Sequence, residues 1–170
     1  GYSVNTTNKD EINEAKEKLI ELKKNGNLLA IGADDNTDKM ARGEAAISIL
    51  WSGEGLNLET EHDNLKFVVP KEGANFWIDS LCIPKGTKNK ENAELFINFL
   101  CEKDPSFRTA DEIGYTTPQK EAREEQDDNV KNNPNAYMDD ELLKKCESYN
   151  YLGDELRLYE EAWTQFKDYQ

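Results

Sequence analysis

Histidine and cysteine are scarce in this chain of 170 residues, which contains one histidine and three cysteines. The cysteines, Cys82, Cys101 and Cys146, are too few and too widely spaced for a disulfide framework or a zinc site. We therefore expect free, buried thiols. The single histidine, His62, lies among acidic and amide residues, which is typical of a solvated surface side chain rather than a general base.

Long apolar runs and positive charge are also lacking. No run reaches the length of about 18 apolar residues that a membrane-spanning helix needs. The 35 Asp and Glu residues outnumber the 21 Lys and Arg residues, and the formal net charge is -14. This charge repels phosphate backbones and anionic lipid surfaces, so nucleic acids and membrane surfaces are disfavoured as partners, whereas cationic ligands are favoured.

Motifs for catalysis and for phosphate binding are missing as well. No serine lies in a Gly-x-Ser-x-Gly elbow, and Gly53 and Gly55 flank Glu54 without the third glycine and the lysine of a phosphate-binding loop. We expect neither an enzyme nor a bound cofactor. The chain begins Gly1-Tyr2-Ser3 without an initiator methionine or a signal segment, and we interpret it as an excised piece.

One acidic loop resembles the start of a calcium site. Asp34, Asn36 and Asp38 have the spacing of the first EF-hand ligands. The pattern fails at Lys39, where glycine is required, and at Ala45, where the bidentate glutamate belongs. We therefore predict no metal site and interpret the loop as an acidic turn before a helix.

Hydrophobic periodicity predicts an α/β fold with a helical tail, in which the apolar run 45–51 suits a strand that is buried on both faces of a parallel sheet. Thr7 and Asp10 suggest a capping box for the first helix, and Gly26 suggests its end. The expected helices cover residues 8–24, a short stretch ending near Gly43, about 89–100, 105–113, 138–149 and 153–168, with a polar connection over 124–135. The expected strands cover residues 28–31, 45–51, 66–69 and 75–83.

Aromatic and acidic residues lie where these strands and loops end. Trp51 ends an apolar strand, Trp77 and Asp79 share one face of the strand expected over 75–83, and Tyr115 follows Gly114 in a loop. Core packing would explain any one tryptophan, but a carboxylate in a half-buried strand is costly unless a cation or a donor faces it. Aromatic rings and carboxylates together suit an alkyl diammonium, since rings cover the methylenes and carboxylates pair with the charged ends.

Several longer segments carry a family resemblance. The segments are Gly1-Tyr2-Ser3 with Asn5-Thr6-Thr7, Ile49-Leu50-Trp51-Ser52-Gly53, Val69-Pro70-Lys71-Glu72-Gly73, Phe76-Trp77-Ile78-Asp79-Ser80, Ile113-Gly114-Tyr115-Thr116-Thr117-Pro118 and Tyr159-Glu160-Glu161. In the same order along the chain, they resemble the bacterial spermidine/putrescine-binding proteins of polyamine ABC transporters, and the resemblance covers essentially the whole length.

The resemblance implies a type II periplasmic-binding-protein fold, with a mixed sheet flanked by helices and a carboxyl-terminal helical tail. It implies two lobes that close on a polyamine, putrescine or spermidine. It implies that Trp51, Trp77, Asp79 and Tyr115 line the ligand site, with Asp79 pairing with an ammonium group. It further implies delivery of the ligand to an ABC permease, and a periplasmic or extracellular location with lipoprotein anchoring. A family glutamine falls at about Tyr149 or Asn150, which leaves the choice of polyamine open.

By the same resemblance, the chain corresponds to the carboxyl-terminal half of such a protein. Residues 1–77 and 122–170 would then belong to the second lobe, and residues 78–121 to the first. Because the packing partners of 78–121 would lie in the other half, we expect the piece to dock this segment on itself or to exchange it in a swapped homodimer. Two alternatives stay open: a protein of the same fold for another small solute, and an acidic noncatalytic interaction module.

Overall fold

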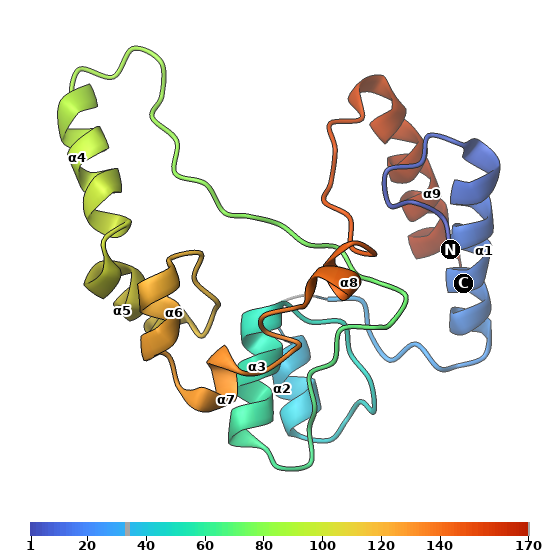
Figure 1. Cartoon of the computed structure of the whole chain (residues 1–170). Coiled ribbons are helices and arrows are strands. Elements are labelled where there is room, and N and C mark those ends of the chain that lie inside the picture. Colours follow the sequence, from blue (N-terminus) through green and yellow to red (C-terminus); the bar gives the residue numbers. More distant parts are fainter. Residues whose placement is uncertain (33–34, 170) are drawn as a thin grey trace.

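The computed structural model of the chain describes residues 1–32 and 35–169, and its regular structure is helical (Figure 1). Three groups of helices form: α1 pairs with α9, α2 with α3, and α5 with both α4 and α6. The helices are α1 (Lys9–Lys24), α2 (Asn36–Ala41), α3 (Ser52–Glu61), α4 (Lys90–Leu100), α5 (Lys103–Ile113), α6 (Lys120–Glu125), α7 (Asp128–Lys131), α8 (Asp140–Leu143), the 3-10 helix η1 (Gly153–Glu155) and α9 (Leu156–Asp168).

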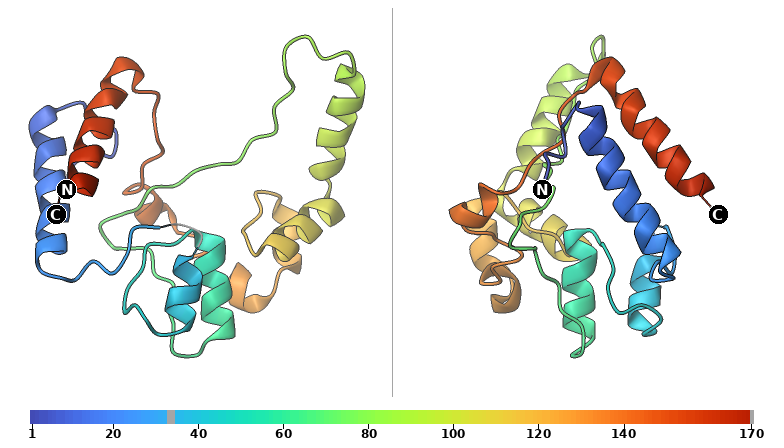
Figure 2. Two further views of the ribbon diagram at one scale, coloured as in Figure 1. Left: turned by 180° about the vertical axis from the view of Figure 1, so that it is seen from behind. Right: turned by 90° about the vertical axis from the view of Figure 1, so that its right-hand side faces the viewer.

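The first and the last long helices of the chain, α1 and α9, lie side by side (Figure 2). The buried side chains of this pair are Ile12 and Ile20 on α1 and Phe166 on α9. The Lys23 ammonium lies 5.6 Å from the centroid of the Phe166 ring and donates to the Lys167 carbonyl oxygen at 3.1 Å. A cation at this position offsets the negative end of α9, so it reinforces the apolar contact.

Local signals predicted several helices correctly. The first predicted helix, the helix from about residue 89, the helix that ends before Gly114 and the last helix are confirmed by α1, α4, α5 and α9. Gly114 has φ 72° and ends α5 in the left-handed conformation that the sequence indicated. The cap of α1 differs from the prediction, because the Asn8 side chain, not that of Thr7, accepts from the Asp10 backbone N–H.

The mixed sheet is not confirmed by this structure. Residues 28–31, 45–50, 66–69 and 76–83 run without regular pairing, and within residues 1–32 and 35–169 one isolated parallel bridge joins Asn75 to Glu147. The Phe76 N–H donates to the Glu147 carbonyl at 3.1 Å, and the Glu147 N–H donates to the Ala74 carbonyl at 3.0 Å. These two bonds hold the extended segment before Trp77 beside the segment that follows α8.

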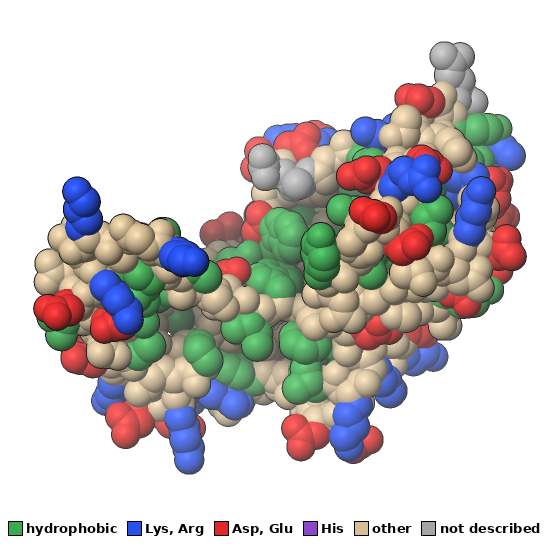
Figure 3. Space-filling view, turned by 90° about the horizontal axis from the view of Figure 1, so that it is seen from above, with side chains coloured by type: hydrophobic (Ala, Val, Ile, Leu, Met, Phe, Trp, Pro, Cys, Tyr) green, Lys and Arg blue, Asp and Glu red, His purple; other side chains and the backbone are tan. Residues whose placement is uncertain are grey.

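The unpaired segments leave much apolar surface in water. Ile47 and Ile49 are 88% and 93% exposed, and Ile78 is 77% exposed. Beyond these segments, α4 carries exposed Leu95 and Phe96 on an arm that the connection before it places away from α1 and α9 (Figures 1 and 2). Figure 3 shows hydrophobic side chains around a hollow in the middle of the molecule. The buried hydrophobic residues belong to separate groups of helices, so the chain has several small buried clusters instead of one core.

Three further expectations are corrected. The helix expected over 138–149 is reduced to α8, because the chain straightens after Cys146 to form the bridge with Asn75. The connection expected over 124–135 contains the end of α6 and the whole of α7. Cys82 and Cys101 are exposed and Cys146 alone among the three cysteines is buried, since Cys82 lies in an unpaired segment and Cys101 caps the outlying helix α4.

The search for membrane spans gives a negative result. Among the residues that the structure describes, no helix has both the length and the apolar character needed to cross a bilayer.

Phe166, which is 2% exposed, should contribute most of the stability of the α1–α9 pair. We expect Phe166→Ala to lower the free energy of unfolding by about 3–5 kcal/mol, because it removes a buried ring and leaves a cavity. Phe96→Ala is the matched control: this ring is 59% exposed, and its loss should cost less than about 1 kcal/mol. Urea titrations followed by circular dichroism measure both values, and equal costs would contradict the assigned packing.

Candidate ligand-binding site

The amino-terminal end of α3 is the structural centre of the candidate site. Trp51 is the N-cap residue of this helix, with φ −67° and ψ 147°, so the extended segment before it turns directly into α3. Gly53 and Gly55 in the first turns are both buried. A Cβ atom at Gly53 would overlap the Tyr115 ring, and one at Gly55 would overlap the Phe67 ring. Aromatic rings thus pack on the helix backbone itself, and only glycine leaves room for them at these two positions.

Tyr115 reaches α3 from the turn that ends α5. Gly114 has φ 72°, which a side chain rarely adopts, and a Cβ atom there would overlap the Asn57 side-chain amide. The Tyr115 N–H donates to the Ala110 carbonyl oxygen at 3.1 Å. The end of α5 and the first two turns of α3 are thus in direct contact, and the Tyr115 ring is fixed at this contact.

Trp51 and Trp77 form an aromatic pair beside this contact. Their ring centroids are 5.0 Å apart and their planes are inclined by 76°, which is the edge-to-face arrangement. The two side chains come from positions that are far apart in the sequence, and they are 50% and 39% exposed. They are in mutual contact and yet keep free ring surface, which a core tryptophan of this size does not.

Two carboxylates act on the Tyr115 hydroxyl. Burial is the largest cause that raises the pKa of Tyr115 above its ordinary value, and the negative charges of Glu54 and then of Asp79 raise that pKa further. Asp79 itself is exposed. Tyr115 therefore lies within electrostatic reach of an acidic residue from α3 and of one from the extended segment after Trp77.

Glu54 is the site residue that sequence reasoning missed. Its Oε2 atom is buried and accepts no hydrogen bond from any described residue. The residue lies in the first turn of α3, where the positive end of the helix dipole favours a carboxylate. The spacing could have identified it, since it lies three positions after Trp51 and one helical turn brings such positions to one side. The sequence did not predict this helix, because Gly53 and Gly55 lie in it and glycine disfavours helices.

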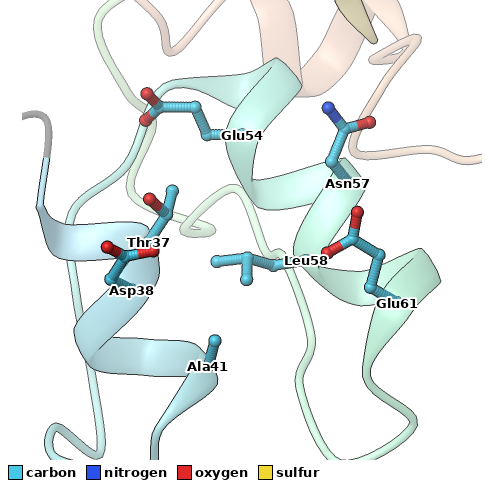
Figure 4. A pocket seen from close by; sticks show the side chains of 7 residues that line it. All are labelled: Thr37, Asp38, Ala41, Glu54, Asn57, Leu58 and Glu61. Atoms are coloured by element: carbon cyan, nitrogen blue, oxygen red, sulfur yellow. The ribbon is translucent and has the colours of Figure 1, made fainter.

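A hollow of about 270 Å³ lies between α2 and α3, and Glu54 lines one end of it (Figure 4). Leu58 points into the space between the two helices, and Glu61 lies at the far end of α3 (Figure 4). Among the described residues no group of histidine, cysteine, aspartate and glutamate side chains could hold a metal ion. Asp34, the first residue of the calcium-like pattern, lies outside the described residues. The lining residues are Thr37, Asp38, Ala41, Glu54, Asn57, Leu58 and Glu61.

The four residues singled out from the sequence are brought together. Trp51 and Trp77 touch, and the Tyr115 ring packs on Gly53, two residues after Trp51. The negative charge of Asp79 contributes to the raised pKa of Tyr115. Three aromatic side chains therefore gather at the start of α3, and the carboxylates of Glu54 and Asp79 lie within electrostatic reach of Tyr115. Such a set can attract an organic cation and cover its carbon chain, and contact with a ligand stays a prediction for each of the residues.

Comparison with known proteins places the chain among binding proteins. It is 38% identical over 167 residues to the spermidine/putrescine-binding periplasmic protein of Salmonella typhimurium, with 98% of this chain and 47% of the relative covered. The protein of the same name from Escherichia coli is 36% identical over the same shares. The chain thus spans about half the length of the curated relatives that it matches.

A solved structure agrees with this result. The spermidine/putrescine ABC transporter substrate-binding protein of Streptococcus pneumoniae is 34% identical and superimposes with a TM-score of 0.86, over 99% of this chain and 52% of that one. The family described as bacterial extracellular solute-binding protein matches residues 1–138. These are binding proteins rather than enzymes, which confirms the expectation of a noncatalytic chain. The chain belongs to the family of bacterial extracellular solute-binding proteins.

Proposed function

We propose that the chain forms part of an extracellular polyamine-binding protein that delivers putrescine or spermidine to an ABC permease. The observation that supports this proposal is that the Trp51, Trp77 and Tyr115 rings gather at the start of α3, with the carboxylates of Glu54 and Asp79 within electrostatic reach of Tyr115. The relatives named for spermidine and putrescine support the same ligand class.

The chemistry of a polyamine matches these side chains. The ligand carries ammonium groups separated by methylenes, so it needs anionic partners at fixed points and apolar surface between them. The exposed ring surface of Trp51 and Trp77 can cover methylenes and attract ammonium groups. The net charge of -14 favours the approach of a cation from solution.

The two carboxylates have separate roles in the proposal. Asp79 is exposed and follows Trp77 by two residues, and it pairs with one ammonium group of the ligand. Glu54 holds a buried oxygen that lacks a donor among the described residues. A buried carboxylate oxygen without a donor is costly, and an ammonium N–H supplies the missing hydrogen bond.

The division of the chain between two lobes is part of the same proposal. Residues 1–77 and 122–170 form part of one lobe, and residues 78–121 belong to the other. The position of α4 and α5 away from α1 and α9 supports this division (Figure 2). Export to the periplasm follows the names of the relatives, and lipoprotein anchoring is proposed for the full-length protein.

Asp79→Asn tests the ammonium partner in the full-length form, in which the chain is completed to the length of its relatives. The substitution removes one charge-assisted hydrogen bond, so the affinity for putrescine should fall about tenfold or more, within the range of about 2–5 kcal/mol for such pairs. Calorimetric titration measures the loss. Asp111→Asn, an exposed aspartate on α5, is the control and should bind as the parent does. Unchanged affinity in Asp79→Asn, with binding of an uncharged or anionic solute, would favour another ligand class.

Glu54→Gln tests the second carboxylate in the same full-length form. The amide keeps the size of the side chain and removes its charge, so putrescine affinity should fall about tenfold. Glu61→Gln is the matched control, because this residue lies on the same helix, lines the same hollow and is remote from the rings. Calorimetry should show a change of less than about twofold for Glu61→Gln. Equal losses would place the cation between α2 and α3 and not beside the rings.

The chain of 170 residues by itself should bind polyamines weakly or not at all, because only part of the proposed cleft is present. The exposed apolar side chains of α4 are unfavourable in water, at about 25 cal/mol per Å². We expect a swapped homodimer in which α4 and α5 dock on a second copy. Light scattering measures the mass of the particle, and a putrescine titration measures binding. A monomer, or binding at micromolar concentration or tighter, would contradict this expectation.

A further inference from the structure

A buried polar network lies directly behind the candidate site. Thr117 and Gln126, at 6% and 5% exposed, are the buried polar side chains among the described residues. The hydroxyl group of Tyr137 links these two residues, Thr117 through its backbone N–H and Gln126 through its side chain. The Thr117 backbone N–H donates to the Tyr137 hydroxyl at 3.0 Å, and that hydroxyl donates to Oε1 of Gln126. Buried polar groups of this kind are stable only while every partner is present.

The network continues to the site through Gln126. Its Nε2 atom donates to the Tyr115 carbonyl oxygen at 3.1 Å, while the Tyr115 N–H is held by Ala110. Both backbone polar groups of Tyr115 are therefore fixed, and its ring rests on Gly53. The direction in which the ring leaves the backbone thus depends on the side chain of Gln126, and the direction of Gln126 depends on Tyr137.

Tyr137 is itself held from a third side. The Arg123 guanidinium lies 3.8 Å from the centroid of the Tyr137 ring, which is close cation–π geometry. Nη2 of Arg123 donates to the Lys131 carbonyl oxygen at 3.1 Å, which ties this contact to α7. The phenol ring thus stacks on α6 and points its hydroxyl at the turn that carries Tyr115.

We propose that Tyr137 is a positioning residue of the ligand site, which acts through Gln126 to hold the Tyr115 ring on α3. The inference rests on the proposed function for its effect on polyamine binding. Tyr115 and Thr117 lie in the proposed first-lobe segment, whereas Gln126 and Tyr137 lie in the segment that returns to the second lobe. The network therefore couples the ligand site to the place where the chain crosses between the lobes.

The first test measures the position of Tyr115 without any ligand. A fluorotyrosine placed at position 115 of the 170-residue chain gives one fluorine NMR signal, whose pH titration reports the pKa of that hydroxyl. Tyr137→Phe leaves the Thr117 N–H and the Gln126 oxygen without their partner and so releases the ring. Because burial, Glu54 and Asp79 raise the pKa of Tyr115, its release should lower that pKa towards the ordinary value and shift the signal.

Tyr159→Phe is the matched control for this experiment. Its hydroxyl is also part-buried and hydrogen-bonded, to the backbone oxygens of Val4 and Thr6, but in the α1–α9 part of the chain. This variant should leave the fluorine signal and the pKa of position 115 unchanged. If Tyr137→Phe also leaves both unchanged while circular dichroism shows a folded chain, the inference is overturned.

A second variant keeps the test decisive if Tyr137→Phe does not fold. Gln126→Met keeps the length of the side chain and removes its donor to Tyr115, so it should shift the same signal in the same direction. An unchanged signal in Gln126→Met would count against the inference as strongly as an unchanged signal in Tyr137→Phe.

The second test uses putrescine affinity in the full-length form. Tyr137→Phe should weaken putrescine binding by about threefold to tenfold, which is the loss in affinity expected when one hydrogen bond is removed. It should have no further effect once Tyr115→Ala is present. Additive effects of the two substitutions would show that Tyr137 acts elsewhere. If the unsubstituted protein binds no polyamine, the proposed function fails, and the fluorine experiment still decides the role of Tyr137.

Discussion

The packing of the Tyr115 ring on the backbone of α3 is the contact on which the rest of the site depends. It requires a helix without a side chain at Gly53, a left-handed turn at Gly114 and a fixed carbonyl at Tyr115, and the structure meets each requirement. The contact joins the end of α5 to the start of α3. Trp51, the N-cap residue of α3, and Glu54, in its first turn, lie on either side of Gly53 in the sequence, so both proposed cation partners adjoin this contact.

The second constraint is the large share of the backbone that lacks regular partners. Extended segments leave N–H and C=O groups to water and present apolar side chains such as Ile47 and Ile49, which a solvated loop does not usually carry. The structural relative matches with a TM-score of 0.86 although the chain covers 52% of it. The segments thus hold a shape that fits a larger protein, and the hydrophobic side chains around the hollow mark where further packing is possible (Figure 3).

Helix ends that depend on single residues were predictable from the sequence, whereas features that depend on contacts between distant segments were not. The end of α5 at Gly114 and the start of α4 after Asn89 follow from backbone preferences of single residues. Helix α3 was not predicted because Gly53 and Gly55 argue against a helix. Glycine is required at these positions because the Tyr115 and Phe67 rings, which come from later in the sequence, pack on them. The exposed state of Cys82 and Cys101 was missed for a similar reason, since burial depends on what packs against a segment.

The sequence by itself determined the acidic charge, the amphipathic helices at both ends and the four residues Trp51, Trp77, Asp79 and Tyr115 as candidates. These features depend on composition, local periodicity and recognisable segments. Only the tertiary structure decided that the two tryptophans touch, that Glu54 has a buried oxygen without a donor, and that Tyr137 reaches Tyr115 through Gln126. The physical reason is that hydrogen bonds and ring contacts between distant segments depend on three-dimensional distance, which no local pattern in the chain encodes.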